Sequence, residues 1–253
     1  MKNKTNKLLY NIIYLVICLL FILATYQILA LIVNNEYSFP KIQYVFDQTI
    51  KLFGENTFWK AFFMSLLRTI IGFILSFVLA FSLSIIYEYL TFSKKFIMII
   101  ISILRAVPTI AIILNLLFWT NSKIAPIIIA CLVTLPQLFA SIIEQLENFD
   151  KDIIQMCNLY CVPKKKIFFN VYIPYVIPRL ALSLCSNFAL TLKLIGSSEA
   201  LCSTINSIGY LMSDAKISYE PARLIALSII CVVSAIILEY SLKFLIKKIW
   251  RIK

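Results

Sequence analysis

Long uncharged stretches alternate with short charged ones along this chain. Residues 8–33 contain no charged residue, and residues 124–143 are likewise uncharged. A helix needs about 20 apolar residues to cross the roughly 30 Å hydrocarbon layer of a bilayer, so each stretch is long enough to be a transmembrane helix. The full pattern predicts six spans, at residues 8–33, 61–87, 96–119, 124–143, 171–195 and 222–246.

Composition supports an integral membrane protein. The chain is 61% hydrophobic and 14% charged, whereas charged residues make up about 25% of a soluble domain. The first span is too long for the apolar core of a signal peptide, which is about 7–15 residues, so we expect it to be retained. The predicted fold class is therefore an all-α, multi-pass protein of the cell membrane, surrounded by the lipid bilayer.

The distribution of Lys and Arg among the loops predicts the orientation. If the amino terminus is cytoplasmic, most basic residues outside the spans are on the cytoplasmic side, as the positive-inside rule requires. Both termini and the segment 144–170 are then cytoplasmic. The residues assigned to the cytoplasm are Lys2, Lys4, Lys7, Lys94, Lys95, Lys151, Lys164, Lys165, Lys166, Lys247, Lys248, Arg251 and Lys253, against Lys41, Lys51, Lys123 and Lys216 outside.

Two longer outer segments and one cytoplasmic segment divide the chain. The segment 34–60 carries aromatic residues suited to a membrane interface, and the segment 196–221 is polar and rich in small residues. We expect an N-terminal part, residues 1–60, with the first span and outer loop. A core domain, residues 61–250, contains the other five spans and the cytoplasmic loop 144–170.

Several kinds of chemistry are excluded by residues that the chain lacks. It contains no histidine, which excludes histidine–metal sites and Ser-His-Asp triads. Glycine occurs only at positions 54, 72, 196 and 209, and no phosphate-binding loop motif is present. The chain is thus predicted not to be an enzyme, to have no ATPase site of its own, and to need no cofactor or metal. The net charge of +12 is explained by topology, without a nucleic-acid partner.

The polar segment near the middle of the chain predicts a short amphipathic helix over residues 150–161. Ile153, Ile154, Cys157 and Cys161 follow the spacing of one helical face, and Asp152 suits the amino-terminal end. Pro163 ends or turns the chain, and a second short helix follows from Lys164. On composition alone, an ordinary helix at the lipid headgroups is the favoured explanation of this segment.

The same segment resembles the conserved cytoplasmic loop of binding-protein-dependent ABC importer permeases of the type I fold. The loop in that family reads E-A-A, three residues, G, about nine residues, then I-x-L-P. Gln155, Met156 and Cys157 match E-A-A, Cys161 matches G, and "VYIP", residues 171–174, matches I-x-L-P. A cysteine at the glycine position requires either ordinary helical backbone or a positive φ.

Other segments resemble the same family in the same order, over roughly residues 60–250. They are "LRAVPTIAIILNLLFW" (104–119), "LKLIGSSEAL" (192–201), "SIGYLMSDAK" (207–216) and "SAIILEYSLK" (234–243). Among these permeases the sequence is most similar to the subgroup for sulfonates, taurine, nitrate and pyrimidine precursors of thiamine. The resemblance implies a six-helix permease that works with a cytoplasmic ABC ATPase, an extracytoplasmic solute-binding protein and a second copy of itself.

In that family the loop forms coupling helices that dock into a groove on the ATPase, and ATP-driven closure of two ATPase subunits moves the spans to alternate access. The resemblance implies that the ATPase-coupling residues are Asp152, Gln155, Met156, Cys157, Leu159, Cys161, Lys164 and Pro174. Cys157 and Cys161 have alternative interpretations: small residues at a tight interface, soft-metal ligands or redox-sensing thiols.

Three charged residues within the spans are candidates for the translocation path: Arg105, Lys193 and Glu199. Arg105 either extends toward the cytoplasm or lines the cavity. Lys193 pairs with Glu199 or presents positive charge to an anionic solute. A self-sufficient channel or secondary transporter is the alternative function, and a membrane-embedded enzyme is a more distant one. The predicted solute is a small anion or polar molecule.

Overall fold

The computed structural model describes residues 14, 17, 20–21, 24–32, 35, 39–90, 92–148, 151–167, 170–171 and 173–250. The side chains of Tyr89, Lys151, Ile154, Asn158, Lys164, Lys165 and Ile173 are outside this description. The described residues between 14 and 32 are helical, but much of the first predicted span falls outside the described residues.

The rest of the described chain is a succession of α-helices. Four of them, α3, α6, α9 and α11, are long and apolar enough to cross a membrane, which confirms helices at the second, fourth, fifth and sixth predicted spans. The elements are α2 (Ile42–Gly54), α3 (Asn56–Tyr89), α4 (Ser93–Ala106), α5 (Thr109–Trp119), α6 (Ala125–Glu147), α7 (Lys151–Leu159), α8 (Lys164–Ile167), α9 (Ile173–Leu201), α10 (Ile208–Ile217) and α11 (Pro221–Trp250).

The third predicted span differs from the structure, because residues 96–119 are not one helix. Helices α4 and α5 meet at a bend of 93°. Pro108 has no N–H to continue the helix, and it forces the preceding residue out of the helical region. Val107 accordingly has an extended backbone, with φ −71° and ψ 126°. An apolar pattern could not distinguish this broken pair from a straight span.

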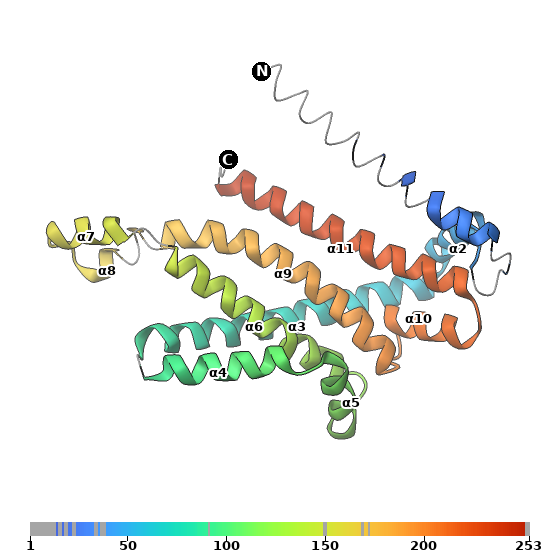
Figure 1. The fold of residues 1–253 in the computed structure, drawn as a ribbon, viewed down its shortest axis with the longest axis horizontal. Helices are drawn as coiled ribbons and strands as arrows, with labels where there is room; N and C mark the ends of the chain where they lie inside the picture. The colour runs from blue at the N-terminus through green and yellow to red at the C-terminus, as the bar shows by residue number, and fades with distance from the viewer. Residues whose placement is uncertain are drawn as a thin grey trace, which may run out of the picture.

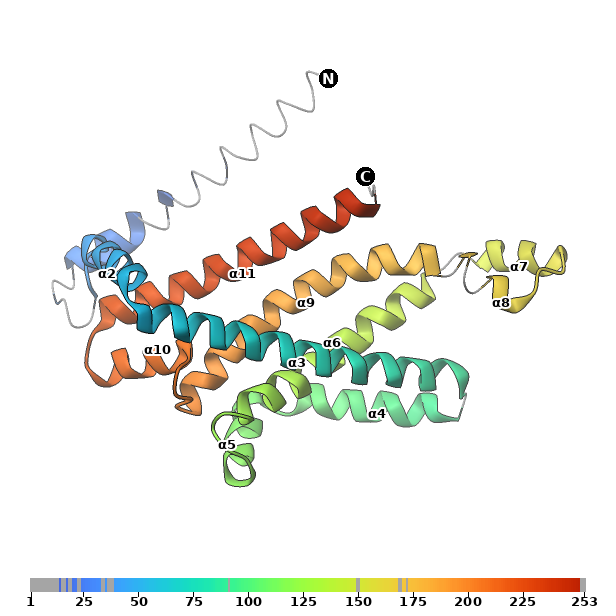
Figure 2. The same ribbon diagram turned by 180° about the vertical axis from the view of Figure 1, so that it is seen from behind.

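The long helices are arranged as a fan with one helix across it. Helices α11, α9, α6 and α4 follow one another across the fan, and each packs on its neighbour. Helix α3 crosses the opposite face and contacts α4, α6 and α9 (Figures 1 and 2). Helices α7 and α8 project from one end of the fan, while α2 and α10 lie at the other end.

A stripe of small residues allows α3 to approach the fan closely. The stripe consists of Ser65, Thr69, Gly72, Ser76, Ala80 and Ser84, all of them buried. A Cβ atom on Gly72 would lie 3.4 Å from the Cβ atom of Ala130 in α6. The Ser76 hydroxyl donates to the Cys131 carbonyl at 3.2 Å and accepts from the Thr134 hydroxyl at 2.9 Å. Close backbone approach and interhelical hydrogen bonds are the interactions that associate helices in lipid, where apolar burial alone drives little.

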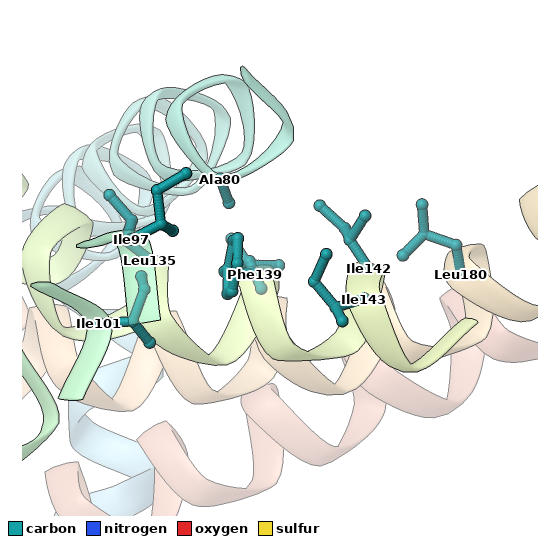
Figure 3. Close-up of a cluster of buried hydrophobic side chains, with 9 residues drawn as sticks. Ala80, Ile97, Ile101, Leu135, Phe139, Ile142, Ile143 and Leu180 are labelled. Carbon is teal, nitrogen blue, oxygen red and sulfur yellow. The ribbon is translucent and has the colours of Figure 1, made fainter. Parts of the chain in front are cut away.

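The largest buried cluster lies between α3, α4, α6 and α9, and Figure 3 shows its side chains. Phe139 of α6 is 2% exposed and sits among residues from the neighbouring helices. Its ring meets that of Tyr87 edge-on, with centroids 5.6 Å apart. The other members are Ala80, Ile97, Ile101, Leu135, Leu138, Ile142, Ile143 and Leu180. This cluster joins α4 to the fan toward the end from which α7 projects.

Gly209 brings α10 into direct contact with the last turns of α9. A Cβ atom at this position would collide with the Ala200 backbone nitrogen, the Glu199 Cβ atom and the Gly196 carbonyl oxygen. Backbone atoms cannot move aside as a flexible side chain can, so position 209 accepts only glycine in this packing.

We expect Gly209→Ala to destabilise the protein by about 1–3 kcal/mol, as overpacking of a close contact typically does. Thermal unfolding of the purified protein in nanodiscs measures the effect. Gly54→Ala is the matched control, because nothing lies within 4 Å of a Cβ atom there. Equal melting temperatures for the two variants would contradict the close contact.

Candidate functional site

Helix α7 and the short α8 form a projecting hairpin between α6 and α9 (Figure 1). This arrangement confirms the short helix and the second helix starting at Lys164 that the sequence predicts. Asp152 lies in the first turn of α7, where a negative charge favours the helix dipole. Pro163 precedes α8, and its carbonyl accepts the Lys166 and Ile167 N–H groups at 2.8 and 3.2 Å.

The hairpin presents apolar side chains to its surroundings. Ile153 is 37% exposed, Met156 59%, Leu159 81% and Tyr160 80%. The predicted stripe instead contained Cys157, which is half-buried, and Cys161, which lies beyond the end of α7. The exposed apolar surface is therefore offset from the predicted one and is centred on Met156 and Leu159. We call these four side chains the α7 surface.

Cys161 adopts the positive-φ alternative that its sequence position left open, with φ 49°. Helix α7 ends at Leu159, so Cys161 is the second residue past the end. The Val162 N–H donates to the Cys157 carbonyl at 3.0 Å, which is the six-to-one bond of a Schellman motif. Glycine usually takes the left-handed position of this motif because it has no Cβ atom.

We expect Cys161→Gly to stabilise the end of α7 by about 1 kcal/mol, since a left-handed backbone costs non-glycine residues about 1–2 kcal/mol. Hydrogen exchange of the α7 amides in the full-length protein measures this. Cys157→Gly is the matched control and should act in the opposite direction by roughly 0.3–0.5 kcal/mol, because it places glycine inside the helix. Faster exchange in Cys161→Gly would contradict the assignment.

The other predicted residues of this loop are distributed around the hairpin. Gln155 is exposed on α7, and Pro174 is exposed in the first turn of α9. Lys164 begins α8, but its side chain is outside the described residues. Both Cys157 and Cys161 are free thiols. Among the described residues, no three Cys, Asp or Glu side chains are grouped closely enough to hold a metal ion.

Tyr175 joins the two chain ends at the base of the hairpin. Its hydroxyl donates to the Asn148 carbonyl at 3.0 Å, at the end of α6. One turn along α9, the Arg179 guanidinium lies 3.6 Å from the centre of the Tyr175 ring and donates to the Tyr175 carbonyl at 3.3 Å. A cation near the carboxyl end of α6 also favours that helix dipole. Sequence reasoning missed this contact, because no local pattern links residues 148 and 175.

Glu199 is fully buried, and its partner is Arg68. The Arg68 Nη1 atom lies 2.9 Å from the Glu199 Oε1 atom, and the Ser65 hydroxyl donates to Oε2 at 2.6 Å. The Gly209 backbone N–H also lies close enough to the carboxylate to interact with it electrostatically. The Ile208 N–H donates to the Ser65 oxygen at 3.0 Å. The carboxylate therefore connects α3, α9 and the first turn of α10, and a pair with Lys193 is not formed.

Lys193 belongs to a polar stripe on α9. Between residues 178 and 200, the exposed residues of this helix are Arg179, Ser186, Lys193 and Ser197. Ser186 donates to Glu239 of α11 at 2.9 Å, and Lys243 pairs with the same carboxylate at 2.6 Å. Lys193 is close enough to interact electrostatically with Glu239. Two cations thus surround one carboxylate at the edge between α9 and α11.

Helix α6 and the last turn of α4 contribute further polar groups. The exposed residues of α6 are Gln137, Glu144 and Glu147. Arg105, at the end of α4, is exposed and donates to the Pro136 carbonyl of α6 at 3.0 Å. Pro136 is inside α6, next to Gln137, so Arg105 and Gln137 lie near each other. The role of Arg105 in a path stays a prediction.

The helices at the edges of the fold expose a different surface. The exposed side chains of α3 are largely apolar and include Phe63, Met64, Leu67, Ile70, Ile71 and Ile74. Those of α11 include Ile229, Val232, Val233, Ile236, Ile237 and Tyr240. Hydrocarbon accepts such surfaces but penalises exposed charges. The polar stripes of α6 and α9 are thus unsuited to lipid, whereas the outer faces of α3 and α11 suit it.

Comparison with known proteins gives one family and a consistent fold. The family model described as "Binding-protein-dependent transport system inner membrane component" matches residues 89–251. A search of curated proteins found no significant match. Among solved structures, the fold is similar to an amino acid ABC transporter crystallised with histidines, at 15% identity and TM-score 0.62, covering 77% of this chain and 93% of that one. It is also similar to the inward-facing MetNI methionine ABC transporter, at 13% identity and TM-score 0.59, covering 75% and 93%.

Proposed function

Because this chain belongs to the family of binding-protein-dependent transport system inner membrane components, we propose that it is the permease subunit of an ATP-driven importer in the cytoplasmic membrane. Its partners are a cytoplasmic ABC ATPase, an extracytoplasmic solute-binding protein and a second copy of itself. The second copy is needed because one chain supplies only half of a path. The coupling residues are those of the α7–α8 hairpin.

The observation that carries this proposal is the projecting hairpin with an exposed apolar surface. A helix that only rested on lipid would need no projection beyond the fan. Met156 and Leu159 are exposed by 59% and 81%, which suits insertion into a groove on a partner. Tyr175 ties the base of the hairpin to α6, so a force applied at α7 reaches α6 and α9 together.

We expect Leu159→Asp to abolish copurification with the cognate ATPase, since loss of a central apolar anchor costs about 2 kcal/mol or more, roughly 30-fold in affinity. Ile217→Asp is the matched control. Ile217 is 73% exposed and is the last residue of α10, a helix that lies at the opposite end of the molecule from the hairpin. This variant should bind the ATPase normally. Both variants should keep the wild-type melting temperature. Normal ATPase binding by Leu159→Asp would remove the hairpin from the docking site.

We place the translocation path along the polar stripes of α6 and α9. Ser186, Lys193 and Ser197 are exposed on one side of α9, and Gln137 is exposed on α6. The surplus positive charge around Glu239 suits an anionic solute, of the sulfonate or nitrate type or a related polar molecule. Glu199 serves the path indirectly, because its carboxylate is buried and holds α10 in place.

We expect Lys193→Met to lower uptake of an anionic solute severalfold in proteoliposomes that contain the ATPase and binding protein. ATP hydrolysis should be largely retained, because Lys193 lies 20 residues beyond the start of α9, which is about 30 Å along the helix from the hairpin. Lys216→Met, an exposed lysine on α10, is the control and should transport normally. Unchanged uptake in Lys193→Met would exclude the path role.

The alternative, a self-sufficient channel or secondary transporter, makes a different prediction in the same preparation. It requires solute flux through liposomes that contain this chain alone, without ATP or a binding protein. The importer shows no flux under those conditions.

A further inference from the structure

Helix α2 has three distinct sides, of which only one packs against the rest of the protein. Val45 and Leu52 are buried, at 7% and 0% exposure, in a cluster with Phe58 of α3 and Leu227 of α11. Ala226 and Ile230 of α11 complete the cluster. This side fixes α2 against the end of α11 that is opposite the hairpin (Figures 1 and 2).

The two remaining sides of α2 differ in chemistry. With about 100° between successive residues, Phe46, Ile50 and Phe53 fall on one flank of the helix, next to the buried side. They are 64%, 57% and 47% exposed. Asp47 and Lys51 are also exposed and fall on the other flank. An exposed apolar flank beside a charged flank is typical of a helix that lies in a membrane interface.

The apolar flank continues into the lipid-suited face of α3. The Phe53 ring lies 5.9 Å from the Trp59 ring, and Trp59 donates its indole N–H to the Phe53 carbonyl at 2.9 Å. Trp59 in turn lies 6.1 Å from Phe63, which is 59% exposed at the start of the apolar face of α3. Tryptophan at such a junction is typical of the boundary between hydrocarbon and headgroups.

We propose that α2 is an interfacial anchor whose flank of Phe46, Ile50 and Phe53 is embedded in the bilayer at the headgroup boundary. The charged flank of Asp47 and Lys51 faces the headgroups and water. Helix α2 packs against α11 at the end opposite the hairpin. With 13 residues it is too short to cross the hydrocarbon layer, so it lies at the membrane surface where α11 runs through the bilayer. The Arg223–Glu55 ion pair, at 3.1 Å, ties α11 to the joint between α2 and α3.

The anchor holds the ends of α3 and α11 at one depth in the bilayer. Both helices expose apolar surfaces to lipid, whereas α6 and α9 carry the polar stripes. Helices α3 and α11 therefore keep a constant position along the membrane normal. This assignment does not depend on the identity of the transported solute or of the ATPase.

Depth-dependent fluorescence quenching tests the anchor on the full-length chain. In a background with Trp59, Trp119 and Trp250 replaced by Phe, one tryptophan is placed at Phe46→Trp or, as the matched neighbour on the charged flank, at Asp47→Trp. The proteins are reconstituted in nanodiscs of phosphatidylcholine brominated near the headgroup or near the chain end. Thermal unfolding establishes that each variant is folded, and Ile50→Trp repeats the measurement one turn away.

We expect lipid brominated near the headgroup to quench Phe46→Trp and Ile50→Trp at least about twofold more than Asp47→Trp. Lipid brominated near the chain end should quench all three weakly. Iodide in the aqueous phase should quench Asp47→Trp more strongly. Strong iodide quenching of Phe46→Trp and Ile50→Trp would overturn the proposal. The flank would then face water, where it could bind a soluble protein. Absence of quenching by both lipid and iodide would also overturn it, because another protein surface then covers the flank.

Discussion

The buried Arg68–Glu199 ion pair is the interaction on which the arrangement of the end of this protein opposite the hairpin depends. A charge buried within a membrane protein is costly unless it is paired and hydrogen-bonded. Glu199 satisfies both requirements through Arg68 and Ser65. The pair joins α3 to α9 across 131 residues of sequence. Ser65, which donates to Glu199, also accepts the Ile208 N–H in the first turn of α10. Removing either charge alone would leave its partner buried without an opposite charge.

The two ends of the molecule are held together by different means. Around Glu199, three helices share a charged and fully buried network. At the other end, α6 and α9 are joined by apolar packing, with Leu180 in the same buried cluster as Ile142 and Ile143, and by the hydrogen bond from the Tyr175 hydroxyl to the Asn148 carbonyl. In an importer of the proposed kind, the end held by apolar packing and one hydrogen bond receives the force of the ATPase.

Sequence reasoning recovered the elements that depend on local pattern and missed those that depend on distant partners. Apolar runs and caps are local, so the four long helices and the α7–α8 hairpin could be predicted. To predict the bend after Ala106, the helix-breaking effect of Pro108 would have to be given more weight than the continuous apolar pattern of residues 96–119. The partner of Glu199 could not be predicted, because nothing in the sequence selects Arg68 from among the intramembrane cations. The predicted face of the short helix included Cys161, but α7 ends at Leu159 and Cys161 lies beyond it with a left-handed backbone.

The small-residue stripe of α3 has a consequence for how this protein tolerates sequence change. Every residue from Ser65 to Ser84 lies in one helix, yet only those that face α6 and α9 are restricted in volume. On the opposite side, Leu67, Ile71 or Leu75 could exchange with any apolar residue at little cost. Substitutions accepted during evolution would therefore recur with the 3.6-residue period of the helix. Related sequences would keep Gly, Ala, Ser or Thr on the packed face of α3 even where overall sequence identity is low.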